Sequence, residues 1–223
     1  MWQITEHAQA GRRALSLDDF DRDFLAICEA HRAQGRALAF AFIIFDARSP
    51  HLRKALDDDA YWQALDALSG RQITVFSFLA YLHERSPEAP QRVMRAMFAV
   101  PANLVANPQD RLTELFPGLA RAKLPAILFF QVADREVVGS TTVSLNAEIE
   151  PASAYNEVAA ILTAALESIA AVDDENASNA QEIFGLIKSA VEDHARTRKV
   201  RAIYNGVRKL PLAVIVRLAH GLV

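Results

Sequence analysis

The chain has 223 residues, of which 52% are hydrophobic and 23% are charged, so it can bury a core and is not an intrinsically disordered protein. It contains one cysteine, Cys28, which excludes an internal disulfide framework and a cysteine-rich structural zinc site. The formal net charge of −3 hides an asymmetry. From His194 onward there are seven Lys or Arg residues and no Asp or Glu, and taking these seven from the total of 24 leaves 17 basic against 27 acidic residues in an acidic body.

Two features of the sequence indicate where in the cell the protein is expected. They are residues 1–19 and the densest apolar run. Residues 1–19 contain an arginine pair but no apolar run of secretory length, so we expect no signal peptide. The apolar run at 37–45 is about half as long as a helix that spans a bilayer. With a single cysteine as well, these features lead us to expect a cytoplasmic protein.

The first expected element is a helix over residues 16–35, which Ser16 begins and Gly35 ends. Helical spacing places Cys28 and His31 on one face with neighbouring apolar residues. Cys28 lies in the middle of the helix, away from the positive helix end that would favour a thiolate. We therefore interpret Cys28 as a small buried hydrophobe, and His31 as a partly buried histidine with a hydrogen-bond partner.

Two strands joined by a helical connection are expected next. Residues 36–45 are almost continuously apolar, which predicts a strand buried on both faces, and residues 72–79 form the second strand. Between them, Ser49 and Pro50 are typical of an N-cap and a first helical position, and the helix is expected to break near the acidic run 57–59. Because the connection crosses over, the two strands should be parallel neighbours.

The stretch from about 80 to 124 is predicted to be a helical insert. Residues 91–100 are expected to form one helix, and Asn107 is expected to cap a second helix that ends near Pro117. We interpret this insert as a flap over a groove.

The second half of the chain predicts a hairpin and then helices. Only three residues separate the strands expected at 126–132 and 136–145, which favours an antiparallel hairpin. Helices are expected at about 152–171 and about 180–196. The predicted fold is an α/β mixed sheet of about four strands flanked by helices. Residues 1–171 form the domain, and residues 172–223 form a basic helical extension.

This order of elements resembles the thioredoxin fold over roughly residues 17–171. The Leu124-Pro125 pair before an Ile-Leu-Phe-Phe strand also resembles the segment that carries the family's cis-proline. The resemblance places the two redox cysteines after the first core strand, where this chain has Ser49 and Leu52 around Pro50-His51. Neither serine nor leucine exchanges with a disulfide. The sequence therefore predicts a thioredoxin-like protein without redox activity.

Four residues are the candidate ligand-binding residues: Arg48, Ser49, His51 and Pro125. The free N–H groups and the dipole of a helix N-terminus favour an anion or a thiolate. The first hypothesis is a binding or assembly module that does not catalyse a reaction. The second is a glutathione-transferase-like enzyme with Ser49 as the candidate catalytic residue, although the turn after Val132 lacks the Glu-Ser pair that many transferases use. A capped helix start with a surface histidine is the plain alternative.

No cofactor is expected, and glutathione is the one ligand that the resemblance introduces. The six histidines and the acidic runs do not follow a metal-ligand spacing, so no metal site is expected either.

The basic tail has an amphipathic pattern, because Val200, Ile203, Tyr204 and Val207 recur at i, i+3, i+4 and i+7. The predicted interaction residues of the tail are Arg198, Lys199, Arg201, Ile203, Val207, Arg208 and Lys209. We expect the tail to dock on the acidic body or on a neighbouring subunit, which makes a protein partner or a homo-oligomer the first expectation. An anionic membrane surface is the second, and nucleic acid the last, because the acidic body repels phosphate.

Overall fold

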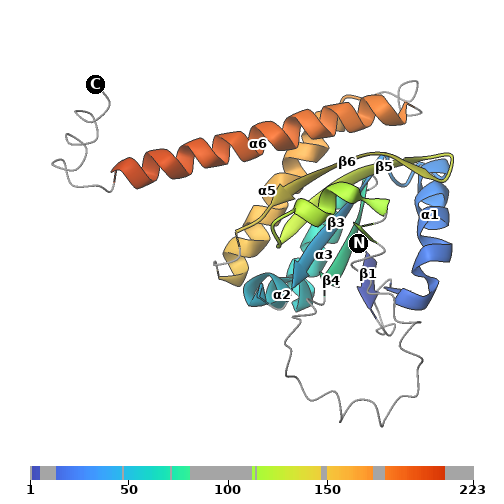
Figure 1. Cartoon of the computed structure of the whole chain (residues 1–223), viewed down its shortest axis with the longest axis horizontal. Coiled ribbons are helices and arrows are strands. Elements are labelled where there is room, and N and C mark those ends of the chain that lie inside the picture. The colour runs from blue at the N-terminus through green and yellow to red at the C-terminus, as the bar shows by residue number, and fades with distance from the viewer. Residues whose placement is uncertain are drawn as a thin grey trace, which may run out of the picture.

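A computed structural model describes residues 2–5, 14–46, 48–70, 72–80, 112–113, 115–146, 150–172 and 179–208. Figure 1 shows a twisted sheet with helices on both faces and one long helix along the side of the molecule. Within these residues, no helix combines the length and the apolar character needed to cross a bilayer.

Four neighbouring strands of the sheet are those predicted from the sequence: β3 (Ala39–Asp46), β4 (Ile73–Ala80), β5 (Ala126–Ala133) and β6 (Glu136–Ser144). Strand β3 is parallel to β4 and antiparallel to β5, and β5 forms an antiparallel hairpin with β6. Every residue of β3 is buried, as its continuous apolar sequence predicts. The predicted α/β architecture with a mixed sheet is therefore confirmed.

Two further strands, β1 (Trp2–Thr5) and β2 (Ala14–Ser16), extend the sheet beyond β4 in the order β2-β1-β4-β3-β5-β6. The sequence-based expectation of about four strands covers β3 to β6 and does not include these two. Segments of four and three residues are too short to show an alternating pattern. The first of them acquires its strand character by pairing with the edge of β4, which lies about seventy residues away in the chain.

The helices near the start of the chain follow the predicted boundaries closely. Helix α1 (Leu17–Ala33) ends just before Gly35, which has a φ of 64° that glycine adopts without steric cost. The predicted break in the connection between β3 and β4 is confirmed, because α2 (Pro50–Asp57) and α3 (Asp59–Ser69) are separate helices. Asp58 starts α3, since its carboxylate accepts hydrogen bonds from the backbone N–H groups of Ala60 and Tyr61.

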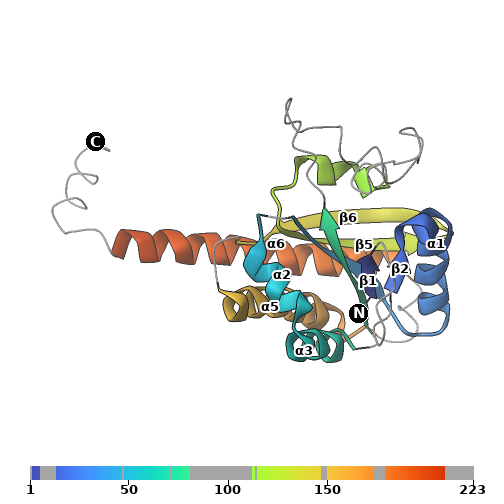
Figure 2. The same ribbon diagram turned by 90° about the horizontal axis from the view of Figure 1, so that it is seen from below.

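The C-terminal half contributes η2 (Pro117–Arg121) and two long helices, α5 (Pro151–Ile169) and α6 (Ala180–Arg208). Helix α6 is longer than the predicted 180–196. It packs along α5 and the β5–β6 hairpin over its first part and then continues past the edge of the sheet (Figure 2).

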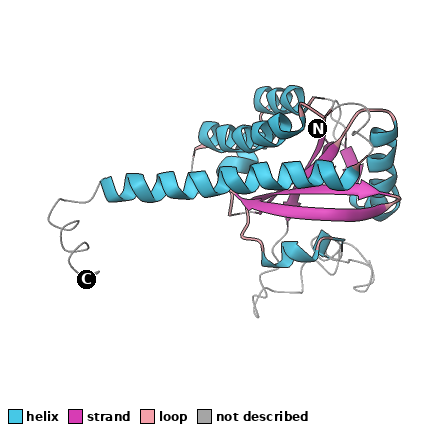
Figure 3. Cartoon of the chain, turned by 90° about the horizontal axis from the view of Figure 1, so that it is seen from above, coloured by secondary structure: helices cyan, strands magenta, loops and turns pink. Residues whose placement is uncertain are grey.

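Helices α2, α3, α5 and α6 cover one face of the sheet, and α1 with the 112–121 segment covers the other (Figure 3). The core on the first face is mainly aliphatic, and the core on the second is rich in phenylalanine. The helix predicted at 91–100 and the start of the helix predicted from Asn107 lie outside the described residues, and so does most of the expected flap. Residues 112–113 and 115, near the end of that second helix, are helical.

Candidate binding site at the end of strand β3

The candidate site is built around Asp46, the last residue of β3, whose side chain is only 1% exposed. Its carboxylate accepts a hydrogen bond from the backbone N–H of Arg48 at 2.9 Å. It also accepts bonds from Nε and Nη2 of the Arg48 guanidinium at 3.0 and 2.8 Å. A buried carboxylate is stable only when it is paired and hydrogen-bonded, and Arg48 supplies both conditions here.

Ser49 lies at the N-terminus of α2 and is completely buried. It stands at the predicted N-cap position, but its side chain makes no capping hydrogen bond to the helix. Its hydroxyl instead donates to the Asp46 carboxylate at 3.3 Å, and its backbone N–H donates to the Asp46 carbonyl at 3.0 Å. The hydroxyl proposed for stabilising a thiolate is therefore directed at an existing carboxylate.

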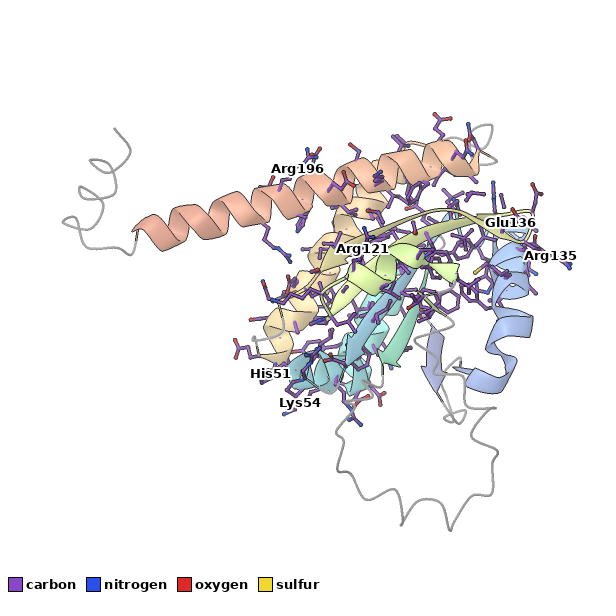
Figure 4. The ribbon with its side chains drawn as sticks, viewed as in Figure 1. His51, Lys54, Arg121, Arg135, Glu136 and Arg196 are labelled. Carbon is purple, nitrogen blue, oxygen red and sulfur yellow. The ribbon has the colours of Figure 1, made fainter. Side chains whose placement is uncertain are left out.

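The other candidate residues are distributed around this pair. The Arg48 side chain is 70% exposed even though it bonds Asp46, and His51 is exposed on the outer side of α2 beside Lys54 (Figure 4). Pro125 is buried directly before β5, after a Leu124-Pro125 peptide that is cis, as predicted. Because Ala126 pairs with Ile44, Pro125 lies at the edge of the sheet where β3 ends.

This arrangement changes the chemistry expected at the N-terminus of α2. The positive end of a helix attracts an anion, but a carboxylate from the chain itself already lies beside it. Positions 49 and 52, where the resemblance would place two cysteines, hold Ser49 and Leu52, which are both buried. Arg48 and His51 are exposed on either side of this helix start, and their side chains can donate hydrogen bonds to a bound partner.

The central residue of this cluster, Asp46, was not among the sequence-derived candidates. The signal that points to it is an acidic residue at the end of an otherwise apolar strand, followed after one alanine by Arg48 and Ser49, which can both donate hydrogen bonds to it. Sequence alone does not show that the carboxylate is buried, because strand-end side chains are commonly solvated.

The interpretations of Cys28 and His31 are both confirmed. Cys28 is fully buried, and burial, with a smaller contribution from the charge of Glu29, raises the pKa of its thiol well above the usual value. His31 is buried as well, and its Nδ1 lies 2.8 Å from the Thr74 hydroxyl on β4. Neither side chain reaches the surface to act on a substrate.

Of the predicted interaction residues in the tail, Arg198 contacts the body. Its guanidinium bonds the carboxylate of Glu157 on α5 and donates to the Ser144 carbonyl of β6 at 2.7 Å. The Glu157 carboxylate also accepts from the backbone N–H of Asn146. Burial raises the pKa of Glu157, and the contacts with Asn146 and Arg198 offset that effect only in part.

The remaining tail residues from Lys199 to Arg208 belong to the helical backbone of α6, and Lys209 lies outside the described residues. The structure thus ties one of the predicted tail residues, Arg198, to the body.

In the parts of the chain that the structure describes, no group of three or more His, Cys, Asp or Glu side chains is placed to hold a metal ion. No protein-family model, curated protein or solved structure matches the chain.

Proposed function

We propose that the protein is a thioredoxin-like binding or assembly module without redox activity. Supporting this proposal, strands β4, β3, β5 and β6 follow one another in the sheet in the order expected of that fold, with the helical connection between β3 and β4. The observation that carries the proposal is which residues occupy positions 49 and 52 and how deeply they are buried. Both are buried, neither is a cysteine, and Ser49 donates its hydrogen bond to Asp46.

The binding surface proposed for the body is the edge where β3 ends and β5 begins. Arg48 and His51 are exposed there, and Arg53 and Lys54 are exposed on the same short helix, where Asp57 pairs with Arg53 at 3.6 Å. Asp58 and Asp59 are exposed at the far end of this helix, so the basic groups gather at its start, where they favour a partner that offers acidic side chains. The basic tail is the second proposed contact surface.

The second candidate function, a glutathione-transferase-like enzyme, is less well supported. A transferase needs a hydroxyl that can approach the thiol of its substrate, whereas Ser49 is buried and bonded to a carboxylate. A thiolate bound there would meet the negative charge of Asp46, which disfavours it.

Site-specific photo-crosslinking tests the binding surface. A photoreactive amino acid is placed at His51 and, as the control, at Asn156, which is exposed on α5. We expect a discrete crosslinked partner from position 51 in cells, and we expect Arg48→Glu to abolish it. Equal crosslinking from both positions, or a product that Arg48→Glu does not affect, would contradict the proposed surface.

The melting temperature in the presence of glutathione separates the two candidates. A ligand that binds only the folded protein stabilises it by about 2.7 kcal/mol at a hundred times its dissociation constant. We expect millimolar glutathione to leave the melting temperature unchanged. A rise that is absent from a Ser49→Ala variant would favour the enzyme.

A further inference from the structure

The last described contacts between side chains of α6 and the body are made by Arg198. Ahead of it, Ile183, Ile187 and Val191 are buried in the aliphatic core, so this part of α6 belongs to the body. At Arg198 the guanidinium bonds both Glu157 of α5 and the Ser144 carbonyl of β6. A helix that is held by its core side chains and by a largely buried ion pair leaves the body in a defined direction.

Beyond that point α6 continues as a helix to Arg208. At a rise of 1.5 Å per residue, the last ten residues extend about 15 Å further. Figures 1, 2 and 3 agree that this end of α6 projects away from the sheet and from the other helices. The Debye length at physiological ionic strength is about 8 Å, so much of this end is screened from the acidic body.

The sequence of the projecting end differs sharply from that of the body. It contains Lys199, Arg201 and Arg208, and no acidic residue occurs anywhere after Asp193. Because the backbone is helical to Arg208, the spacing of Val200, Ile203, Tyr204 and Val207 is that of one helix face. Such a segment needs a surface that offers negative charge and an apolar layer together.

The alternatives to a lipid surface lack one of these two properties. The projecting end points away from its own body. A second copy offers acidic charge, but among the side chains that the structure describes, the only exposed large hydrophobics are Val138 and Leu186, at 38% and 39% exposure. Two projecting ends that paired with each other would bring together like charges. Nucleic acid offers phosphate but no apolar layer for the stripe.

We propose that the projecting end of α6, residues 199–208, binds an anionic lipid surface and lies in its interfacial region, without crossing it. Lys and Arg side chains are attracted to anionic headgroups, and the apolar stripe is buried at the boundary with the acyl chains. The docked part of α6 acts as a rigid spacer that keeps the acidic body from opposing this attraction. This inference deepens the proposed function and rests on it for the role of the tail as a contact surface, but it does not involve Arg48 or His51.

Vesicle flotation with the full-length protein tests the inference. The probes are phosphatidylcholine vesicles with and without phosphatidylglycerol. We expect binding only to the anionic vesicles, weakening as salt is added. Each basic residue near such a surface contributes roughly fivefold to affinity, so Lys199→Gln with Arg201→Gln should weaken binding by at least about tenfold. Ile203→Asp should weaken binding at least as much, because it places a charge within the apolar stripe.

The matched control removes the same number of charges elsewhere. Lys188→Gln on the docked part of α6 and Arg121→Gln on η2 are both exposed, and together they should leave vesicle binding unchanged. Equal loss in both double variants, or equal binding to neutral vesicles, would overturn the proposal. A dimer in light scattering that the tail variants dissociate, with no vesicle binding, would replace the lipid by a second copy. Salt-sensitive binding to duplex DNA alone would replace it by nucleic acid.

The photo-crosslink from position 51 is scored independently in the same tail variants. If vesicle binding fails while the crosslink persists, the lipid proposal is wrong and the binding surface of the body stands. If the crosslink fails while vesicle binding persists, the proposed binding surface of the body is wrong and the lipid proposal stands.

Discussion

The two faces of the central sheet are packed by different kinds of side chain, although the same strands supply both. On one face β3 places Phe40 and Phe42 in a cluster rich in aromatic rings, and on the other it places Ala39, Ala41 and Ile43 against the helices. Small residues let the helices approach closely where four of them cover the sheet. Large rings fill the space where α1 and a short segment are the described cover. Among the described residues, the face covered by fewer helices carries the larger rings.

On the aromatic face, Phe42 and Phe130 each lie next to several other rings, and Phe42 is the one that β3 supplies. Its ring lies 5.3 Å from that of Phe24, 5.2 Å from that of Phe76, 5.9 Å from that of Phe116 and 5.2 Å from that of Phe130. Rings at these separations stabilise one another beyond the area they bury. The cluster described on the aliphatic face consists mainly of aliphatic side chains, and many of them contribute to its stability.

The largest expected loss of stability comes from truncating Phe42. Phe42→Ala should lower the free energy of unfolding by about 4 kcal/mol, because it leaves a cavity bordered by four rings. The adjacent Ile43→Val on the aliphatic face should lower it by only about 1 kcal/mol. Urea denaturation measures both values, and a loss for Phe42→Ala as small as that for Ile43→Val would contradict the ring packing described here.

The second prediction concerns the ion pair that holds α6 on the aliphatic side. Arg198→Ala should lower the free energy of unfolding by about 3 kcal/mol at neutral pH, because Glu157 then buries an unpaired charge. The pKa of Glu157 is already raised on folding, and the variant raises it further. The folded state thus binds this proton more tightly than the unfolded chain does. The resulting stabilisation is fully present below the unfolded pKa and is lost as the pH rises through the folded pKa.

Denaturation of the Arg198→Ala variant should therefore approach that of the unaltered protein as the pH falls through the raised pKa of Glu157. Arg196→Ala is the control, because its pairs with Glu192 and Asp193 are exposed and contribute little. If the loss of unfolding free energy in Arg198→Ala does not change with pH, the guanidinium stabilises the protein through packing alone.

A smaller effect is expected where α6 crosses β6. A Cβ atom added at Gly139 would lie 2.6 Å from Cδ1 of Phe184, so Gly139→Ala must displace that ring. We expect the free energy of unfolding to fall by about 1.5 kcal/mol. Adding Phe184→Ala should remove most of this penalty, and the double-mutant cycle measures the coupling between the two positions. If the losses of the two single variants simply add in the double variant, Phe184 does not pack against Gly139.

The smallest effect should come from Cys28 on the aromatic side. Cys28→Ala removes one buried sulfur and should lower the free energy of unfolding by about 1 kcal/mol. In the unaltered protein a thiol reagent should modify Cys28 only as the protein unfolds, because burial raises the pKa of the thiol. Rapid modification of the folded protein would contradict the packing described for α1.

The sequence predicts those elements whose signals are local or strongly periodic. Strands β3 and β4, the hairpin and the break at Asp58 all follow from apolar runs, turn lengths and capping residues. Strands β1 and β2 do not, because a short segment becomes a strand only when a distant edge is there to pair with it. The extent of α6 beyond 196 was also underestimated, although the apolar spacing of the tail continues the helix.

The helix start at Ser49 and Pro50 was predicted from the sequence, but the contacts around it were not. The sequence directs attention to Arg48 and Ser49 through the expected helix start. It does not show that their donors converge on Asp46, because that depends on how the chain turns between β3 and α2. Side-chain hydrogen bonds of this kind compete with ordinary capping, and sequence spacing alone does not decide between them.

The buried Asp46 carboxylate also limits how this protein could be re-engineered. Introducing cysteines at positions 49 and 52 would place one thiol beside a carboxylate and the other in the aliphatic core. Both surroundings disfavour a thiolate. A titration of the Ser49→Cys thiol should accordingly give a pKa above that of free cysteine. An engineer who wanted an oxidoreductase on this scaffold would have to replace Asp46 before any cysteine became useful.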